Sequence, residues 1–396
     1  TVQIFNQGVN NLLDRQADVT KTQEQLASGK RIMNASEDPA GTARTLDITS
    51  QLSRIDGYQR NTVAVQSSLN LEESALGSVV NDLQRARELT IQANNATMSA
   101  SDKKSVAVEL ASIFESLVAA ANTRDASGAY IFAGYQSDTQ PFSKTSTGAT
   151  YNGDDGQRFM QVSADVQIGS SNPGSEVFMS AAAGNGSFDY RGAAANAGAA
   201  VVTTTAAAAN YVPETYTLAF IQANANDPIT YTVTGDISGQ VATGNYTEGG
   251  AITFANGEVT LEGLPTHGDT FTITSAPRQD MFTTIKDIES VLASASDSAA
   301  SATRINNEAS RALTNLDNAL EKILTVQSDV GTRMRRAEMQ IDTNEAFNYQ
   351  LKDALSGLQD LDYAEAISRL NIQMLGLQAA QQTFARTQNM SLFNYL

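Results

Sequence analysis

Only a few residues of this chain have the type and spacing that metal binding requires. The single histidine, His267, stands in Pro265-Thr-His-Gly-Asp269, a sequence typical of a turn, and a zinc site there would need three carboxylates. The segment Asn152-Gly-Asp-Asp-Gly156 is similar to the start of a calcium loop, but the last ligand position of such a loop would be Ser163 and not Glu. We therefore interpret both segments as turns and predict no metal site.

The sequence also lacks the patterns that carry nucleophilic or phosphate chemistry. It has no cysteine, no G-x-x-x-x-G-K-[ST] loop and no G-x-S-x-G elbow. A basic cluster at Arg333, Arg335 and Arg336 is compatible with a solvated helix flank or with an ion pair to an acidic neighbouring subunit. We predict no catalytic residue, no cofactor and no enzymatic activity.

Charge and composition exclude further classes of function. The formal net charge is −17 over 396 residues, which disfavours binding to nucleic acid or to anionic membranes. No apolar run approaches the roughly 18 residues of a membrane span. The absence of cysteine excludes disulfides, and 41 % hydrophobic residues are enough for a folded protein of two or three domains.

Long helices are predicted at both ends of the chain, and the first of them has a heptad seam. Spacings of three and four residues alternate along it, the pattern by which one helix packs on another. The seam consists of Val2, Phe5, Val9, Leu12, Gln16, Val19, Gln23 and Leu26. Ser28-Gly29 suits a helix C-cap, and Ser36 or Asp38 suits the N-cap of a second helix over about 40–95, with Pro39 in its first turn.

The C-terminal arm repeats this pattern. Its last seam consists of Ile367, Leu370, Met374, Leu377, Gln381 and Phe384, and continues to Gln388 and Ser391. No proline lies between Arg278 and Leu396, which predicts a helical arm with little interruption. A further helix is expected from Ser101 to about Ser127-Gly128, followed by a short strand-like run at 130–134.

Glutamine stands at seam positions in both terminal helices: Gln16 and Gln23 in one, Gln381 and Gln388 in the other. A polar seam residue lowers stability and can fix register and partner. This pattern predicts ends that are marginal alone and become ordered when neighbouring subunits surround them. The alternative is that these glutamines lie on the solvated edge of each stripe.

Between the helical halves the hydrophobic period changes to two. The runs 216–221, 229–234 and 270–274 are typical of strands, and 252–261 is typical of a hairpin with Asn256-Gly257 at its turn. The Ala/Gly/Thr-rich stretch 181–210 is expected to be a loop or a weakly ordered insertion.

The predicted fold is mainly α, with a small antiparallel β domain inserted into a long antiparallel helical bundle or coiled coil built from both chain ends. We expect three regions. They are a terminal coiled-coil assembly domain (1–40 and 355–396), a helical bundle domain (41–140 and 280–354) and a β-rich variable domain (141–279).

Three segments resemble a known family. Gln25–Pro39, followed by Ala40-Gly41, is similar to the N-terminal block of the flagellin superfamily, with Ser28, Gly29, Asn34, Asp38 and Pro39 at its motif positions. Gly128–Phe142 and the tail Leu377–Leu396 resemble the branch of that superfamily that forms the hook-filament junction of the bacterial flagellum. The resemblance covers both helical arms and does not extend to 141–279.

The resemblance implies a structural subunit stacked between hook-associated protein 1 and the flagellin filament, in a layer with copies of itself. It also implies passage through the flagellar type III export apparatus, without a cleavable signal peptide, to an extracellular location. Both terminal seams are then assembly interfaces, and an export chaperone is expected on the stripe from Ile367 to Phe384. Two alternatives remain open: a flagellin of the bulk filament, and a secreted enzyme or adhesin whose active part is 141–279.

Overall fold

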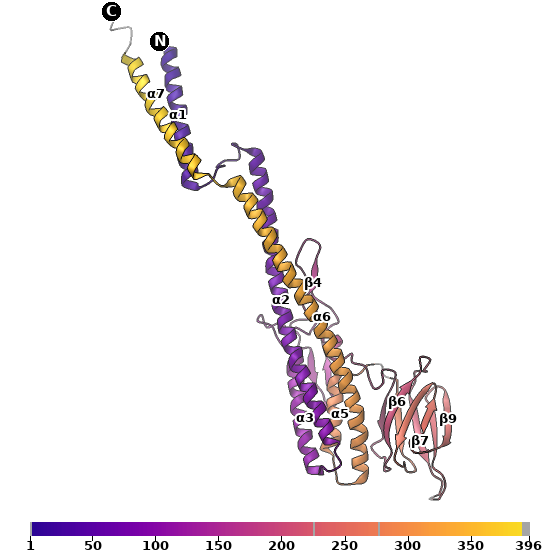
Figure 1. Ribbon diagram of the computed structural model, residues 1–396. Coiled ribbons are helices and arrows are strands. Elements are labelled where there is room, and N and C mark those ends of the chain that lie inside the picture. The colour runs from indigo at the N-terminus through magenta and orange to yellow at the C-terminus, as the bar shows by residue number, and fades with distance from the viewer. Residues whose placement is uncertain (1, 225, 276–277, 390–396) are drawn as a thin grey trace, which may run out of the picture. The chain divides into compact units, whose positions relative to one another are not determined.

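Seven helices account for most of the chain in the computed structural model, which describes residues 2–224, 226–275 and 278–389 (Figure 1). The helices are α1 (Val2–Ser28), α2 (Pro39–Ala93), α3 (Ala100–Ala121), the short α4 (Gly174–Phe178), α5 (Met281–Ala293), α6 (Ala299–Gln359) and α7 (Tyr363–Asn389). The chain divides into two compact units, one formed by 1–61 with 339–396 and the other by 62–338.

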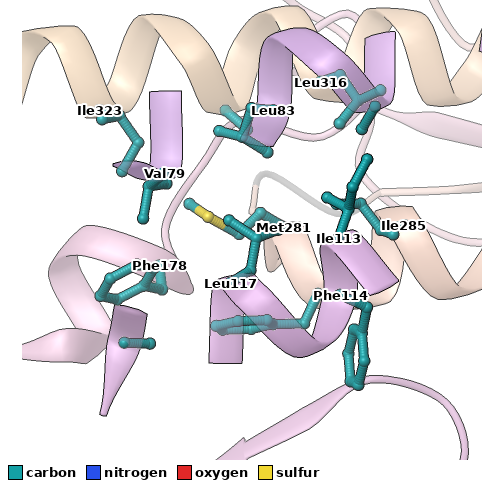
Figure 2. Close-up of a cluster of buried hydrophobic side chains, with 14 of the residues drawn as sticks. Val79, Leu83, Ile113, Phe114, Leu117, Phe178, Met281, Ile285, Leu316 and Ile323 are labelled. Atoms are coloured by element: carbon teal, nitrogen blue, oxygen red, sulfur yellow. The ribbon is translucent and has the colours of Figure 1, made fainter. Parts of the chain in front are cut away.

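The unit 62–338 contains a helical bundle with a continuous apolar core. Buried side chains of α2, α3, α5 and α6 meet along its length, as expected for helices with an apolar stripe that has no contact with water (Figure 2). The residues labelled from these helices are Val79, Leu83, Ile113, Phe114, Leu117, Met281, Ile285, Leu316 and Ile323. Ser99 caps α3 and Asp280 caps α5, each accepting a hydrogen bond from a backbone N–H of the first turn.

Four phenylalanines join a non-helical segment to this bundle. The ring of Phe282 in α5 lies 5.1 Å from that of Phe142, 5.8 Å from Phe178 and 6.3 Å from Phe114, measured between centroids. Phe142 begins the first strand and Phe178 ends α4, and both are fully buried. The segment from 142 to 178 is therefore part of the bundle core.

Twelve strands are found in the described residues between the two helical halves. They are β1 (Phe142–Lys144), β2 (Ala149–Tyr151), β3 (Phe159–Gln161), β4 (Gln167–Gly169), β5 (Asp189–Gly192), β6 (Val201–Ala207), β7 (Tyr216–Ile221), β8 (Thr230–Gly235), β9 (Gly239–Asn245), β10 (Ala251–Phe254), β11 (Gly257–Glu262) and β12 (Thr270–Thr274). All named pairings are antiparallel.

The strands β5 to β12 form two sheets with a core of their own. One sheet has the order β5-β12-β7-β8-β9 and the other β10-β11-β6. Their facing side chains, among them Tyr216, Phe220 and Phe271, form a second buried cluster. The predicted hairpin is confirmed, but its turn lies one residue earlier than predicted: Ala255 and Asn256, which both have positive φ, join β10 and β11, and Gly257 pairs with Phe254 as the first residue of β11.

The fold class is confirmed, but several local predictions are wrong. The stretch 181–210 is not a loop: it contains β5 and β6, because its few apolar residues, such as Val202, face the second core. The run 130–134 is a buried turn and not a strand. The C-terminal arm breaks between α6 and α7 without a proline, where Asp362 accepts hydrogen bonds from the N–H groups of Ala364 and Glu365 at 2.9 and 3.1 Å and so starts a new helix.

The division into three regions stays a prediction. The boundary between the two compact units lies near residues 61 and 339, which are positions inside α2 and α6.

Candidate assembly site

The terminal helices α1 and α7 pack against each other in antiparallel orientation. The rings of Phe5 and Phe384 lie 5.4 Å apart at one end of the pair. Toward the other end, the Thr22 hydroxyl donates to Gln373 Oε1 at 2.8 Å. Residues far apart in the sequence therefore form one element, as the two heptad seams predict.

Five residues of the predicted α1 seam and three of the six residues of the predicted α7 seam are buried, half-buried or in contact with the partner helix. On α1, Val19 is buried, Leu12 and Leu26 are half-buried, and Phe5 contacts Phe384. Val9 is also half-buried, and the side chain of Val2 lies outside the described residues.

On α7, the half-buried seam residues are Leu370, Leu377 and Phe384. The three positions are spaced by seven residues, and so are the three exposed positions of the same seam, so the two sets lie on different sides of the stripe.

The other seam positions face away from the partner helix. Gln16 and Gln23 on α1 are exposed, and so are Ile367, Met374 and Gln381 on α7. In the single chain these three glutamines therefore agree with the alternative of a solvated edge. Gln388 and Ser391 lie outside the residues whose side chains are described. Whether the exposed positions contact neighbouring subunits stays a prediction.

Small and polar residues take the remaining places in the contact. Gly8 lies under the Phe384 ring, since a Cβ added to it would be 2.9 Å from Phe384 Cδ2. Thr22 and Gln25 are buried on α1, and Ala366 is fully buried on α7. The sequence analysis missed them because a heptad seam is recognised by its large apolar residues. Each of these four residues is the sequence neighbour of a residue assigned to the seam.

The breaks between α1 and α2 and between α6 and α7 are joined to each other. The Arg31 N–H donates to Gln359 O at 2.8 Å, and the Leu361 N–H donates to Gly29 O at 3.0 Å. The Arg31 guanidinium adds hydrogen bonds to Leu358 O at 2.9 and 3.2 Å. We name this pairing of 29–31 with 358–361 the clasp, because it connects both helix breaks through backbone hydrogen bonds.

The family-motif residues surround the clasp. Gly29 has φ +68°, which favours glycine, and ends α1 as a C-cap. The Ser28 hydroxyl donates to Gln25 O at 3.2 Å, and Asp38 Oδ1 accepts from the Gly41 N–H at 2.8 Å. Pro39 begins α2, as its fixed φ permits.

Two further polar groups close the turn between α1 and α2. Asn34 O accepts from the Glu37 N–H at 3.0 Å. The Glu37 carboxylate accepts a hydrogen bond from the Met33 N–H, and the Lys21 ammonium lies 3.3 Å from it. Both interactions lower the pKa of Glu37. The motif therefore shapes the turn and does not present a reactive group.

An exposed apolar surface remains on α7 after it has paired with α1. Ile372 and Leu375 are each 69 % exposed and Ile367 is 50 % exposed. Several large apolar side chains left exposed on one helix are typical of contact surfaces in soluble proteins.

The other predicted sites show no chemistry in the described part of the chain. His267 is exposed in a turn and its Nδ1 accepts from the Gln222 N–H at 3.2 Å. Searching the described ranges finds no group of three acidic or histidine side chains placed to hold a metal. No helix among these residues is both long and apolar enough to cross a bilayer. Of the basic cluster, Arg335 and Arg336 are exposed, but Arg333 is buried and pairs with Asp329, so a solvated flank is the wrong interpretation for Arg333.

A cavity of about 710 Å³ lies between the strands β5 and β12 and the helices α5 and α6. Arg311 occupies its wall, with Nε 2.6 Å from Asp189 and Nη1 2.6 Å from Glu308 and 3.0 Å from Asp287. Burial raises the pKa of Glu308, while the charge of Arg311 acts in the opposite direction. These charges are paired with one another, which indicates a structural junction between the β sheets and the bundle.

Comparison with known proteins identifies the family. The models of the bacterial flagellin N-terminal and C-terminal helical regions match residues 1–137 and 313–396. Flagellar hook-associated protein 3 of Salmonella typhimurium is 24 % identical over 395 residues, 99 % of this chain and 98 % of that protein. The protein of the same name from Escherichia coli is 33 % identical over 144 residues, which are 36 % of this chain and 45 % of that protein's length.

A solved structure agrees with these matches. The crystal structure of flagellar hook-associated protein 3 from Legionella pneumophila has a TM-score of 0.72 and 34 % identity, and the match covers 78 % of this chain and 98 % of that one. Flagellins match over a smaller part, 119 residues at 36 % identity, or 24 % of their length. The chain therefore belongs to the hook-associated protein 3 family within the flagellin superfamily.

Proposed function

We propose that this chain is a structural subunit of the hook-filament junction of the bacterial flagellum and has no enzymatic role. The observation that carries the proposal is the α1–α7 pair, which leaves Ile367, Ile372 and Leu375 exposed. Each such side chain contributes about 1.5–3 kcal/mol when it becomes fully buried. Contact with neighbouring subunits is the simplest way to bury all three at once.

The proposed partners follow from this surface and from the family. They are hook-associated protein 1 on one side, flagellin on the other, and copies of the chain in the same layer. Before assembly, an export chaperone covers the α7 stripe while the chain is delivered to the type III export apparatus, and the final location is extracellular. The lack of cysteine supports this route, because no disulfide hinders an unfolded chain in a narrow channel.

Electron microscopy of a strain that lacks this chain tests the junction role. We expect hooks without filaments, with flagellin released into the medium. Normal filaments on such a strain would contradict the proposal. A second test uses the purified chain, which should not elongate filament seeds, whereas a bulk flagellin should, and long filaments of this chain alone would favour the flagellin alternative.

The assembly interfaces can be tested by truncation. Deleting Thr1–Leu26 or Ile367–Leu396 should leave 62–338 folded, because that unit has its own two cores, and should abolish incorporation at the hook tip. Circular dichroism checks the fold and motility in a complemented strain checks incorporation. Motility supported by either truncated chain would contradict the proposed interfaces.

The chaperone contact needs a separate measurement. Ile367, Met374 and Leu375 replaced together by Ser should weaken capture by the purified export chaperone. Replacing the exposed Val108 on α3 by Ser is the control and should have no effect. Equal capture of both variants would place the chaperone elsewhere. The adhesin or enzyme alternative for 141–279 is tested with the full chain on a glycan array and in glycosidase assays, where we expect neither binding nor hydrolysis.

A further inference from the structure

The α1 face that contacts α7 carries two columns of residues, each with a repeat of seven. The apolar column consists of Phe5, Leu12, Val19 and Leu26. Sliding α7 by seven residues would exchange one apolar neighbour of this column for another. Because hydrophobic burial is not directional, the apolar column stabilises the pair without choosing a single register.

The second column consists of Gly8, Arg15, Thr22 and Gly29, none of which has a large apolar side chain. We name it the small-polar column. Unlike the apolar column, its members differ in size and chemistry, so each has its own partner on α7.

In the first two contacts a small residue on one helix faces a large residue on the other. Gly8 is covered by the Phe384 ring, and a Cβ added to it would lie 2.9 Å from that ring. Arg15, a large residue, faces Gly376, whose added Cβ would be 3.5 Å from Arg15 Nη1.

The contact between Arg15 and Gly376 is an ordinary van der Waals distance, and the remaining two contacts are closer. Thr22 is only 3 % exposed and donates to Gln373 Oε1 at 2.8 Å. Gly29 lies under Tyr363, with an added Cβ 2.7 Å from the Tyr363 hydroxyl oxygen.

We propose that the small-polar column, together with the backbone hydrogen bonds of the clasp at its Gly29 end, sets the register of α1 against α7. A slip of seven residues moves one helix along the other by about 10 Å. In one direction it would move the Phe384 ring away from Gly8, which has no Cβ, and toward Arg15, whose exposed side chain would have to move aside. In either direction it would break the hydrogen bond between Thr22 and Gln373, so that the Thr22 hydroxyl keeps only the longer contact to Asp18 O in its own helix, at 3.1 Å, and the half-buried Gln373 oxygen loses this donor.

The register matters for assembly if the proposed function is correct. A slip would move the exposed Ile367 and Met374 by about 10 Å relative to α1, and so displace the surface offered to neighbouring subunits. The register itself does not depend on that function, so it can be tested in the isolated full-length chain.

Distances between two spin labels report the register directly. Because the chain has no cysteine, Asn11→Cys with Asn371→Cys places one label on each helix, at exposed positions outside both columns. We expect one narrow distance distribution for this labelled chain. Gly8→Phe should broaden it or move it by several ångströms, and the exchange variant Gly8→Phe with Phe384→Gly should restore it.

Two further labelled variants keep the test decisive if Gly8→Phe prevents pairing. Thr22→Val with Gln373→Leu removes the hydrogen bond while keeping side-chain volume, and should give a second population with shifted distance. Leu12→Ala, in the apolar column, weakens the pair and should leave the position of the distance peak unchanged.

The proposal is overturned if the Thr22→Val, Gln373→Leu chain keeps the single wild-type distance, or if Leu12→Ala shifts the peak as much as the column variants do. Motility measured in parallel separates the two proposals. A shifted distance with normal motility would contradict the assembly role of the pair, and an unchanged distance would contradict only the register.

Discussion

Glu72 in α2 is a buried carboxyl whose protonation should control the stability of the unit 62–338. Its side chain is fully buried, and Oε1 accepts from the Asn172 N–H at 3.2 Å, while Oε2 has no hydrogen-bond partner among the described residues. Desolvation raises the pKa of Glu72 to about 7 from the ordinary 4.5, although the positive charge of Arg333 opposes this.

The sign of the effect follows from proton binding. Between pH 4.5 and about 7 the folded chain holds a proton on Glu72 that the unfolded chain has released. The free energy of unfolding should therefore fall as pH rises through this window, and Glu72 should add no slope below or above it. At about 1.4 kcal/mol per pKa unit, the loss across the window is roughly 3 kcal/mol.

Glu72→Gln isolates this contribution, because the amide keeps an acceptor for the Asn172 N–H and cannot ionise. Relative to the wild type, the variant should gain roughly 3 kcal/mol in free energy of unfolding between pH 4 and pH 8. Denaturant titrations at both pH values, read by hydrogen exchange of α2 peptides, measure it. Glu88→Gln, at an exposed side chain, controls for the loss of one negative charge from an acidic chain.

A specific result would refute this reasoning. If Glu72→Gln lowers stability by the same amount at pH 4 and pH 8, the Glu72 pKa is not raised in the folded chain. A variant that loses more stability at pH 8 than at pH 4 would show that the Glu72 carboxylate is stabilised by Arg333, so that the ion pair outweighs desolvation.

The remaining predictions concern backbone conformation, core packing and buried charge. Gly29→Ala should destabilise the clasp by about 1–2 kcal/mol because Gly29 has a positive φ, and amide exchange in 28–38 measures this. Gly331→Ala should stabilise α6 by about 0.5–1 kcal/mol, because the glycine lies in the middle of that helix with open space around it, and amide exchange in α6 measures this. Phe282→Ala should cost about 3–5 kcal/mol in chemical denaturation, since it empties the centre of the phenylalanine cluster. Arg311→Met should cost about 3–5 kcal/mol by leaving buried carboxylates unpaired, while the exposed Arg335→Met should change stability by less than about 0.5 kcal/mol.

Much of the helical architecture could be predicted because its signals are local. The start of α2 at Pro39 and the end of α1 before Gly29 follow from the conformations that these residues prefer. The hairpin is also a local signal, because Asn-Gly between two strand-like runs favours a tight turn, although the turn forms at Ala255 and Asn256.

Predictions failed where a partner far away in the sequence decides the outcome. The stretch 181–210 has little hydrophobic signal, yet β6 forms because β11 supplies its hydrogen bonds and Val202 reaches the second core. Likewise, the sequence around Arg333 predicts a surface residue. In the structure Arg333 is buried and donates a hydrogen bond at 2.6 Å to Asn172, which belongs to the segment after β4.

The terminal pair shows the same division most clearly. From the sequence alone, the alternating spacing of three and four residues from Val2 to Leu26 determined that α1 packs along one face. Only the tertiary structure decided which residues complete that face: Gly8 and Thr22 and not Gln16 and Gln23. The physical reason is that a glycine or threonine becomes a contact residue only when a larger side chain, here Phe384 or Gln373, arrives from the other helix to fill the space above it.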